Sequence, residues 1–156
     1  MMKKLVSTIA LSMLLVLLLA GCKTEATPET HVPPLHGGQE AQMIELSVDD
    51  FAAQNHITKV IELIRPGSLI VSLGANPTTG FEWSDAEISD PAVVAEQSFV
   101  YVPPQTESTA VGAPGKSVWV FDSQQPGATT IKMSYSRPWE GGEKDVYTLT
   151  INVEVK

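Results

Sequence analysis

Short segments in which apolar and polar residues alternate dominate the sequence from Met43 to its C-terminal end. Within 129–136, for example, Ile131, Met133 and Tyr135 alternate with polar residues. Alternation with a period of two is typical of a strand that buries one face, and no segment has the period of a convincing amphipathic helix. The sequence therefore predicts an all-β domain, in which 48–54 forms at most a turn or two of helix. The predicted strands are Met43–Val48, Ile57–Ile64, Ser68–Leu73, Phe81–Ser84, Val93–Val102, Ser117–Asp122, Thr129–Ser136 and Val146–Val155.

Turn-forming residues separate these strands at short intervals. Arg65-Pro66-Gly67, Asp90-Pro91 and Gln125-Pro126-Gly127 are three such signals, because proline and glycine favour backbone angles that end a strand. Many short strands at this spacing predict a β-sandwich or a small barrel. The length of the segment 42–156 favours a sandwich built as a single domain around one core.

The N-terminal segment has the three-part layout of a signal peptide. Two lysines form a short positive region, residues 5–20 are almost wholly apolar, and Leu19-Ala20-Gly21-Cys22 closes the segment. These four residues resemble the bacterial lipobox. The resemblance implies that residues 1–21 are a lipoprotein signal peptide and that the thiol of Cys22 is diacylated after cleavage. The alternative is an ordinary secretory signal with an incidental cysteine.

Residues 22–41 are rich in Thr, Glu, Pro and Gly and have no apolar period, which is typical of a flexible tether. A lipid on Cys22 would hold the domain that follows outside the cytoplasm, in the cell envelope, anchored to a membrane by acyl chains. His31 and His36 also lie in the tether, but no third ligand accompanies them. We therefore expect no metal site and no cofactor.

The cysteine count and the net charge exclude several classes of function. Cys22 is the only cysteine, so the domain has no disulfide and no thiol for catalysis. The formal net charge of −8 becomes about −10 when cleavage removes Lys3 and Lys4 (−8 minus 2). A chain this acidic, with no basic patch, is unsuited to binding nucleic acid or to electrostatic attraction to anionic lipid.

One turn, Asn76-Pro77-Thr78-Thr79-Gly80, has little conformational freedom. The Asn76 side chain can bond to the backbone two residues on, Pro77 fixes its φ at about −65°, and Gly80 suits a positive φ. Two small hydroxyl side chains, Thr78 and Thr79, remain at the crest. Taken alone, the segment can be an ordinary connection between strands.

Two later loops carry further signals, Gly112-Ala113-Pro114-Gly115 and Arg137-Pro138-Trp139-Glu140-Gly141-Gly142. The glycines of the first allow a close approach to another surface, or simply a bend. At the hairpin tip formed by the second, we expect Trp139 to be exposed as an interface anchor. The alternative is a ring folded back over the end of the sandwich. Trp83 and Trp119 lie within predicted strands, and we expect both in the core.

The three loops are expected to share one edge, because loops after alternate strands emerge at the same end of a sandwich. Asn-Pro-Thr-Thr-Gly-Phe at 76–81, Gly-Ala-Pro-Gly before a Trp-x-Phe strand and Arg-Pro-Trp-Glu at 137–140 together resemble the chagasin family of papain-like cysteine protease inhibitors. The resemblance covers roughly residues 42–156. It implies an immunoglobulin-like antiparallel β-sandwich and a reversible, competitive, tight-binding inhibitor whose loops wedge into the protease active-site cleft.

Carried over by position, the resemblance places Thr78 and Thr79 over the catalytic Cys and His of the protease. The loops 112–115 and 137–139 would then contact the two sides of the cleft, although Pro114 departs from the glycine common in the family. The residues implied to bind the protease are Asn76, Pro77, Thr78, Thr79, Gly80, Phe81, Gly112, Ala113, Pro114, Gly115, Arg137, Pro138 and Trp139.

A second hypothesis keeps the same edge but gives it another partner: an immunoglobulin-like surface lipoprotein that binds a protein or glycan, as an adhesin does. An enzyme is disfavoured, because the domain lacks a thiol and its histidines fall in the tether or in a predicted turn at His56. Glu140 and Glu143 could suggest a carboxylate pair, but a solvated hairpin tip explains them better. We expect a monomeric binding protein without catalytic residues.

Overall fold

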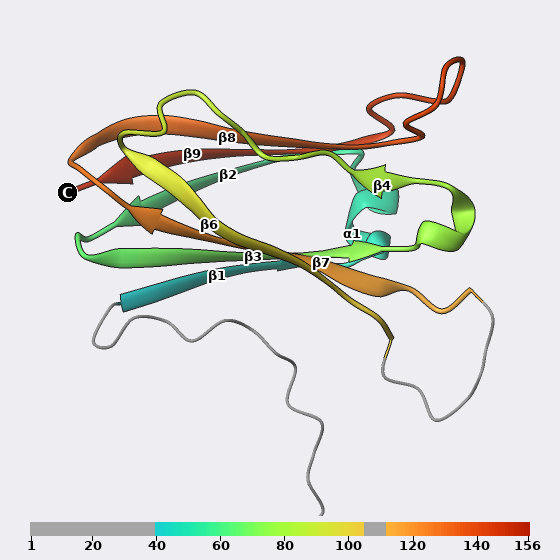
Figure 1. Ribbon diagram of the computed structural model, residues 1–156, viewed down its shortest axis with the longest axis horizontal. Helices are drawn as coiled ribbons and strands as arrows, with labels where there is room; N and C mark the ends of the chain where they lie inside the picture. Colours follow the sequence, from blue (N-terminus) through green and yellow to red (C-terminus); the bar gives the residue numbers. More distant parts are fainter. Residues whose placement is uncertain (1–39, 105–111) are drawn as a thin grey trace, which may run out of the picture.

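Two β-sheets packed face to face make up almost all of the computed structural model, which describes residues 40–104 and 112–156 (Figure 1). The first sheet has the order β1-β3-β7-β6, formed by Glu40–Leu46, Gly67–Ala75, Gly115–Ser123 and Val94–Val102. The second has the order β2-β9-β8-β4, formed by His56–Leu63, Tyr147–Val155, Gly127–Ser136 and Glu82–Trp83, with β5 (Glu87–Ile88) also paired to β8. The helix α1 spans Val48–Ala53, and the 3₁₀ turn η1 spans Pro77–Thr79.

All the predicted strands are present, and the predicted β-sandwich is confirmed. The short strand β5 was not predicted, because a two-residue strand carries no detectable alternation. Predicted as Met43–Val48, the first strand ends earlier, at Leu46, because Ser47 starts a helix. Its hydroxyl accepts from the Asp50 backbone N–H at 3.3 Å, while its own backbone N–H donates to the Asp50 carboxylate at 2.7 Å.

The prediction of an antiparallel sandwich needs one correction at the edges of the two sheets. Strand β1 pairs with β3 in parallel, and β2 pairs with β9 in parallel, while the remaining pairs are antiparallel. Between β1 and β3 the chain crosses to the other sheet to form β2. Because no hairpin joins the two partners, nothing forces them to run in opposite directions.

The inward faces of the strands form one core, as the alternation predicts. The buried apolar residues on the inward faces of β8 and β9 are Ile131, Met133, Tyr135, Leu149, Ile151, Val153 and Val155. Trp83 and Trp119 are 7% and 1% exposed, which confirms their expected place in the core. His56 lies at the start of β2, not in a turn, and its Nδ1 is 2.9 Å from the Thr148 hydroxyl.

Candidate functional site

The turn 76–80, the segment 112–115 and the hairpin loop 137–146 follow β3, β6 and β8 and meet at one end of the sandwich (Figure 1). Two contacts connect them. The Asn76 side-chain amide donates to the Gly112 carbonyl at 2.8 Å, and the Trp139 ring lies against the backbone of Gly80. The expected shared edge is therefore present, and the turn 76–80 lies between the other two loops. We call these three segments the loop edge.

Short hydrogen bonds within the turn 76–80 fix its shape. The Oδ1 of Asn76 accepts from the Thr78 hydroxyl at 2.6 Å and from the Thr78 backbone N–H at 3.2 Å. The Thr79 hydroxyl donates to the Asn76 carbonyl at 2.7 Å, and Gly80 N–H donates to the Pro77 carbonyl at 3.0 Å. The turn is therefore held by bonds among its own residues, while Thr78 and Thr79 remain exposed at the crest.

Two features of the turn require glycine at position 80: its backbone conformation and the close approach of the Trp139 ring. Its φ is +78°, in the left-handed region that side chains with a β-carbon rarely adopt. A β-carbon placed there would lie 2.5 Å from Cη2 of Trp139. The glycine therefore lets the tryptophan ring rest directly on the turn, which joins the first and third loops of the edge.

Arg137 stabilises the hairpin loop through contacts with neighbouring side chains. Its guanidinium carbon lies 4.4 Å from the centre of the Phe81 ring and 5.8 Å from that of Trp139, and its Nη1 donates to the Glu143 carboxylate at 2.9 Å. Lys144 Nζ donates to the carbonyls of Arg137 and Trp139 at 2.5 and 3.2 Å. Arg137 is only half-exposed. It therefore stabilises the loop edge and offers only part of its side chain to a binding partner.

Trp139 is 52% exposed, although its ring rests on Gly80. The expectation of an exposed tryptophan at the hairpin tip is confirmed. The ring also packs on the turn 76–80, so part of the alternative, a ring folded back over the end of the sandwich, holds as well. Pro138 and Pro114 are exposed, Gly112 and Ala113 are half-exposed, and Gly115 is buried at the start of β7. Gly112 has a φ of +92°, which fits the alternative that the glycines let this loop bend.

Tyr135 supports the loop edge from below, which the sequence did not indicate. The backbone N–H of Asn76 donates to the Tyr135 hydroxyl at 2.9 Å, and the Phe81 and Tyr135 rings stack with centres 5.5 Å apart. Alternation predicts only that Tyr135 faces inward. No sequence signal tells which turn its hydroxyl reaches, because that depends on how the two sheets pack.

The carboxylates of the hairpin loop lie at its surface. Among residues 40–104 and 112–156 no three His, Cys, Asp or Glu side chains are grouped as a metal site would need. Glu140 and Glu143 are exposed, and Glu143 is paired with Arg137. Within the same ranges, none of the helices has the length and apolar character required to cross a bilayer. Cys22, His31 and His36 lie outside the described residues.

Comparison with known proteins gives a consistent result. The sequence model of the chagasin family of peptidase inhibitors (I42) matches residues 66–153. Amoebiasin-2 from Entamoeba histolytica is 31% identical over 86 residues, which are 55% of this chain and 68% of the relative.

Solved structures share the fold. The cysteine protease inhibitor EhICP2 from Entamoeba histolytica superposes with a TM-score of 0.59 at 24% identity, over 76% of this chain and 100% of its own. PbICP-C, solved in complex with falcipain-2, superposes with a TM-score of 0.52 at 16% identity, over 75% of this chain and 99% of its own. EhICP2 is matched over its whole length by 76% of this chain, so the matched fold is one that exists by itself in EhICP2.

Proposed function

The chain belongs to the chagasin family of peptidase inhibitors, a family of inhibitors and not of enzymes, and we propose that its loop edge enters the active-site cleft of papain-like cysteine proteases. The domain is an inhibitor of cysteine proteases with an immunoglobulin-like β-sandwich fold. In our proposal the turn 76–80 covers the catalytic residues, while 112–115 and 137–139 contact the two sides of the cleft.

The observation that carries this proposal is the pair of contacts joining the three loops, from Asn76 to Gly112 and from Trp139 to Gly80. A loop that is ordered before docking loses little conformational entropy on binding. An exposed aromatic ring seated on a rigid support is also the side chain most often found as an energetic anchor. The edge therefore has the preorganisation that a tight inhibitor needs.

The geometry of the turn explains how such a domain inhibits without being cleaved. Two internal backbone bonds, Thr79 N–H to Asn76 carbonyl at 3.1 Å and Gly80 N–H to Pro77 carbonyl at 3.0 Å, keep the chain folded back on itself. A peptide bond held in a tight turn is not offered in the geometry that attack by a nucleophile requires. Inhibition is then reversible, non-covalent and competitive with substrate.

The test is inhibition of several papain-like proteases by residues 40–156. We expect competitive inhibition, binding to a protease whose catalytic Cys is replaced by Ala, and an intact 76–80 turn after long incubation. Thr78→Trp should raise the inhibition constant, because a bulky ring at the crest cannot enter a narrow cleft. Lys132→Trp on the exposed outer face of β8 is a size-matched control and should inhibit as the unaltered domain does.

A folded domain that leaves all these proteases active at micromolar concentration would contradict the proposal. The loop edge would then be a recognition surface for another partner, as in the binding-module hypothesis.

We also propose that the protein acts at a membrane of the cell envelope, through a lipid on Cys22. The support is the sequence Leu19-Ala20-Gly21-Cys22 after an apolar segment, followed by a tether rich in Pro, Thr and Gly. One acyl chain gives only weak membrane binding, so the diacylation implied by the lipobox is what would make the anchor stable.

Cell fractionation tests this location. The unaltered protein should fractionate with membranes, and Cys22→Ala should release it or block its processing. Freely secreted protein that has lost residues 1–21 and carries an unacylated Cys22 would refute the lipid anchor, without bearing on protease inhibition.

A further inference from the structure

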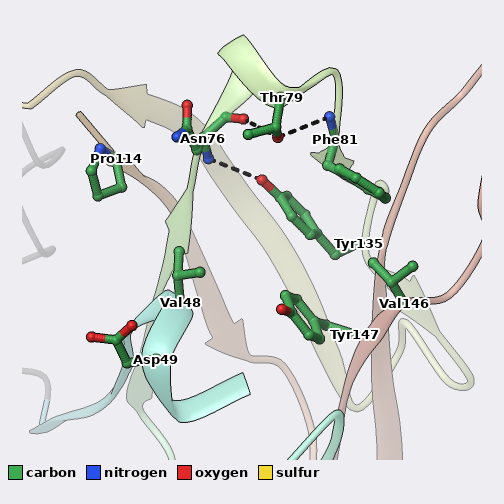
Figure 2. Close-up of a pocket in the computed structure, with 9 residues that line it drawn as sticks. All are labelled: Val48, Asp49, Asn76, Thr79, Phe81, Pro114, Tyr135, Val146 and Tyr147. Atoms are coloured by element: carbon green, nitrogen blue, oxygen red, sulfur yellow. Dashed lines mark hydrogen bonds between the residues drawn. The ribbon is translucent and has the colours of Figure 1, made fainter. Parts of the chain in front are cut away.

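A cavity of about 470 Å³ lies directly beneath the turn 76–80, between that turn and α1 (Figure 2). Its walls come from α1, the turn 76–80 and Phe81, the 112–115 segment, β8, the end of the hairpin loop 137–146 and the start of β9. The residues that line it are Val48, Asp49, Asn76, Thr79, Phe81, Pro114, Tyr135, Val146 and Tyr147. This volume is within the range of pockets that bind small ligands or large side chains.

The walls of the cavity are apolar and rigid. The rings of Phe81, Tyr135 and Tyr147 form a stack in which neighbouring centres are 5.5 and 5.9 Å apart, and Tyr147 also stacks on Phe51 at 5.5 Å. The Tyr135 hydroxyl, at the top of the stack, accepts the Asn76 backbone N–H. Because these rings are held on both sides, the cavity is present before anything binds.

The helix that forms the opposite wall is also fixed. Ser47 caps α1, and its hydroxyl and backbone N–H both donate to the Asp50 carboxylate, at 2.6 and 2.7 Å. These two bonds hold the pKa of Asp50 below its ordinary value, and the bond from the Ser47 hydroxyl has the larger effect. Val48, the first residue of the helix, therefore projects toward the cavity from a stable position (Figure 2).

Most polar groups at the cavity are already engaged or point elsewhere, whereas the Tyr147 hydroxyl is directed toward the space beside α1 (Figure 2). The Asn76 side chain bonds to Gly112 and Thr78, and the Thr79 hydroxyl donates to the Asn76 carbonyl. The Asp49 carboxylate is directed away from the aromatic rings (Figure 2). Because most of the lining is apolar, an occupant of the cavity gains mainly by burying carbon.

The cavity is continuous with the loop edge. Four lining residues, Asn76, Thr79, Phe81 and Pro114, belong to the segments assigned to protease binding. A second cavity of about 220 Å³ adjoins it and shares Val48, Asp49 and Pro114 with it. A protease that covers the turn 76–80 and the 112–115 segment therefore lies at the mouth of this cavity.

We propose that the cavity receives a large apolar side chain, such as leucine, methionine or phenylalanine, from a surface loop of the bound protease beside its catalytic cleft. This proposal rests on the proposed function of the loop edge. It makes α1, Val146 and Tyr147 part of the interface, and it adds a contact outside the cleft through which the inhibitor discriminates between proteases with similar active sites. Rigid apolar pockets that accept one side chain are where binding energy concentrates in protein interfaces.

Filling the cavity tests the proposal. Val146→Phe and Val48→Phe enlarge side chains on opposite walls (Figure 2). Each should raise the inhibition constant roughly tenfold or more for a protease that uses the cavity, while the melting temperature stays equal or rises. Val60→Phe makes the same change on the edge strand β2, where Val60 is 79% exposed, and should leave inhibition unchanged.

A thiol probe gives a second measurement that does not depend on packing a larger ring. Residues 40–156 contain no cysteine, so Val146→Cys has a single thiol. With a protease whose catalytic Cys is replaced by Ala, binding should slow its alkylation by iodoacetamide at least tenfold, as followed by mass spectrometry. The matched variant Val60→Cys should be alkylated equally fast, free or bound.

The outcomes separate the two proposals. If the unaltered domain inhibits and both filled variants inhibit equally well, or if Val146→Cys reacts equally fast in the complex, the cavity is not a protease subsite. If the unaltered domain does not inhibit at all, the proposed function itself fails.

Discussion

Trp83 and Trp139 lie at the same end of the sandwich, but they occupy opposite environments. Trp83 is 7% exposed, packs against the Phe51 and Tyr135 rings with centres 5.0 Å away, and donates its indole N–H to the Gly74 carbonyl at 3.0 Å. Trp139 is 52% exposed, and its ring rests on Gly80 with the Arg137 guanidinium 5.8 Å from the ring centre. One ring belongs to the aromatic core beneath the turn 76–80, and the other lies over that turn.

The contrast between the two rings separates stability from recognition in this domain. The Trp83 ring holds the end of β3, because its hydrogen bond goes to Gly74, two residues before the turn begins at Asn76. The outer ring is held in place by the turn and leaves half its surface free for a partner. We therefore expect some substitutions to change the free energy of unfolding and others to change the inhibition constant.

The largest effect is expected at Trp83. Trp83→Ala should lower the free energy of unfolding by ~3–5 kcal/mol, because it opens a cavity in the core and leaves the Gly74 carbonyl without its partner. Denaturant unfolding measures the loss. Protein that is still folded at low temperature should inhibit nearly as well as the unaltered domain. A stable Trp83→Ala variant with lost inhibition would reverse the roles given to the two rings.

The next largest effect is expected at Trp139. Trp139→Ala should weaken inhibition by roughly 2 kcal/mol, about 30-fold, because an exposed aromatic anchor is lost. The melting temperature should hardly change, since half of the ring is already in solvent. Trp139→Phe is the matched control and should keep part of the affinity. A large fall in melting temperature with unchanged inhibition would show that the ring serves the fold alone.

Gly80 connects the two regions, and Gly80→Ala should affect both. A β-carbon there is strained at φ +78° and displaces the Trp139 ring, so we expect a loss of stability of about 1–2 kcal/mol and roughly tenfold weaker inhibition. Gly141→Ala separates the two causes, because Gly141 has a φ of +74° but nothing within 4 Å of its β-carbon position. It should cost similar stability and spare inhibition. Equal losses of inhibition in both variants would argue against the ring contact.

The smallest effect is expected at the ion pair between Arg137 and Glu143, in which the Glu143 side chain is 62% exposed. Glu143→Gln should change inhibition by less than about threefold, because exposed ion pairs contribute roughly 0–1 kcal/mol and salt screens them. Raising the salt concentration should produce the same small change in the unaltered domain. Glu62→Gln, which removes an exposed pair with Lys156, is the control. A large effect of Glu143→Gln would show that this pair, rather than ring contacts, positions the hairpin loop.

Local patterns in the sequence are enough to predict every strand except β5, the environments of the tryptophans and the conformation of the turn 76–80. Alternation records which face of a strand avoids water, so Ile131 and Leu149 are assigned to the core from the sequence alone, and both are buried. The turn was predictable because its bonds are local. Asn76 bonds to Thr78, and the chemistry of a few adjacent residues sets the shape.

The way in which separate segments meet depends instead on tertiary packing. The parallel pairing of β1 with β3, the bond from Asn76 to Gly112, the support of the turn by Tyr135 and the cavity beside α1 all join residues far apart in sequence. Alternation tells that a residue faces inward, but not which residue it faces across the core. That partner is set by the stagger and separation of the two sheets, which arise from the packing of all their side chains together.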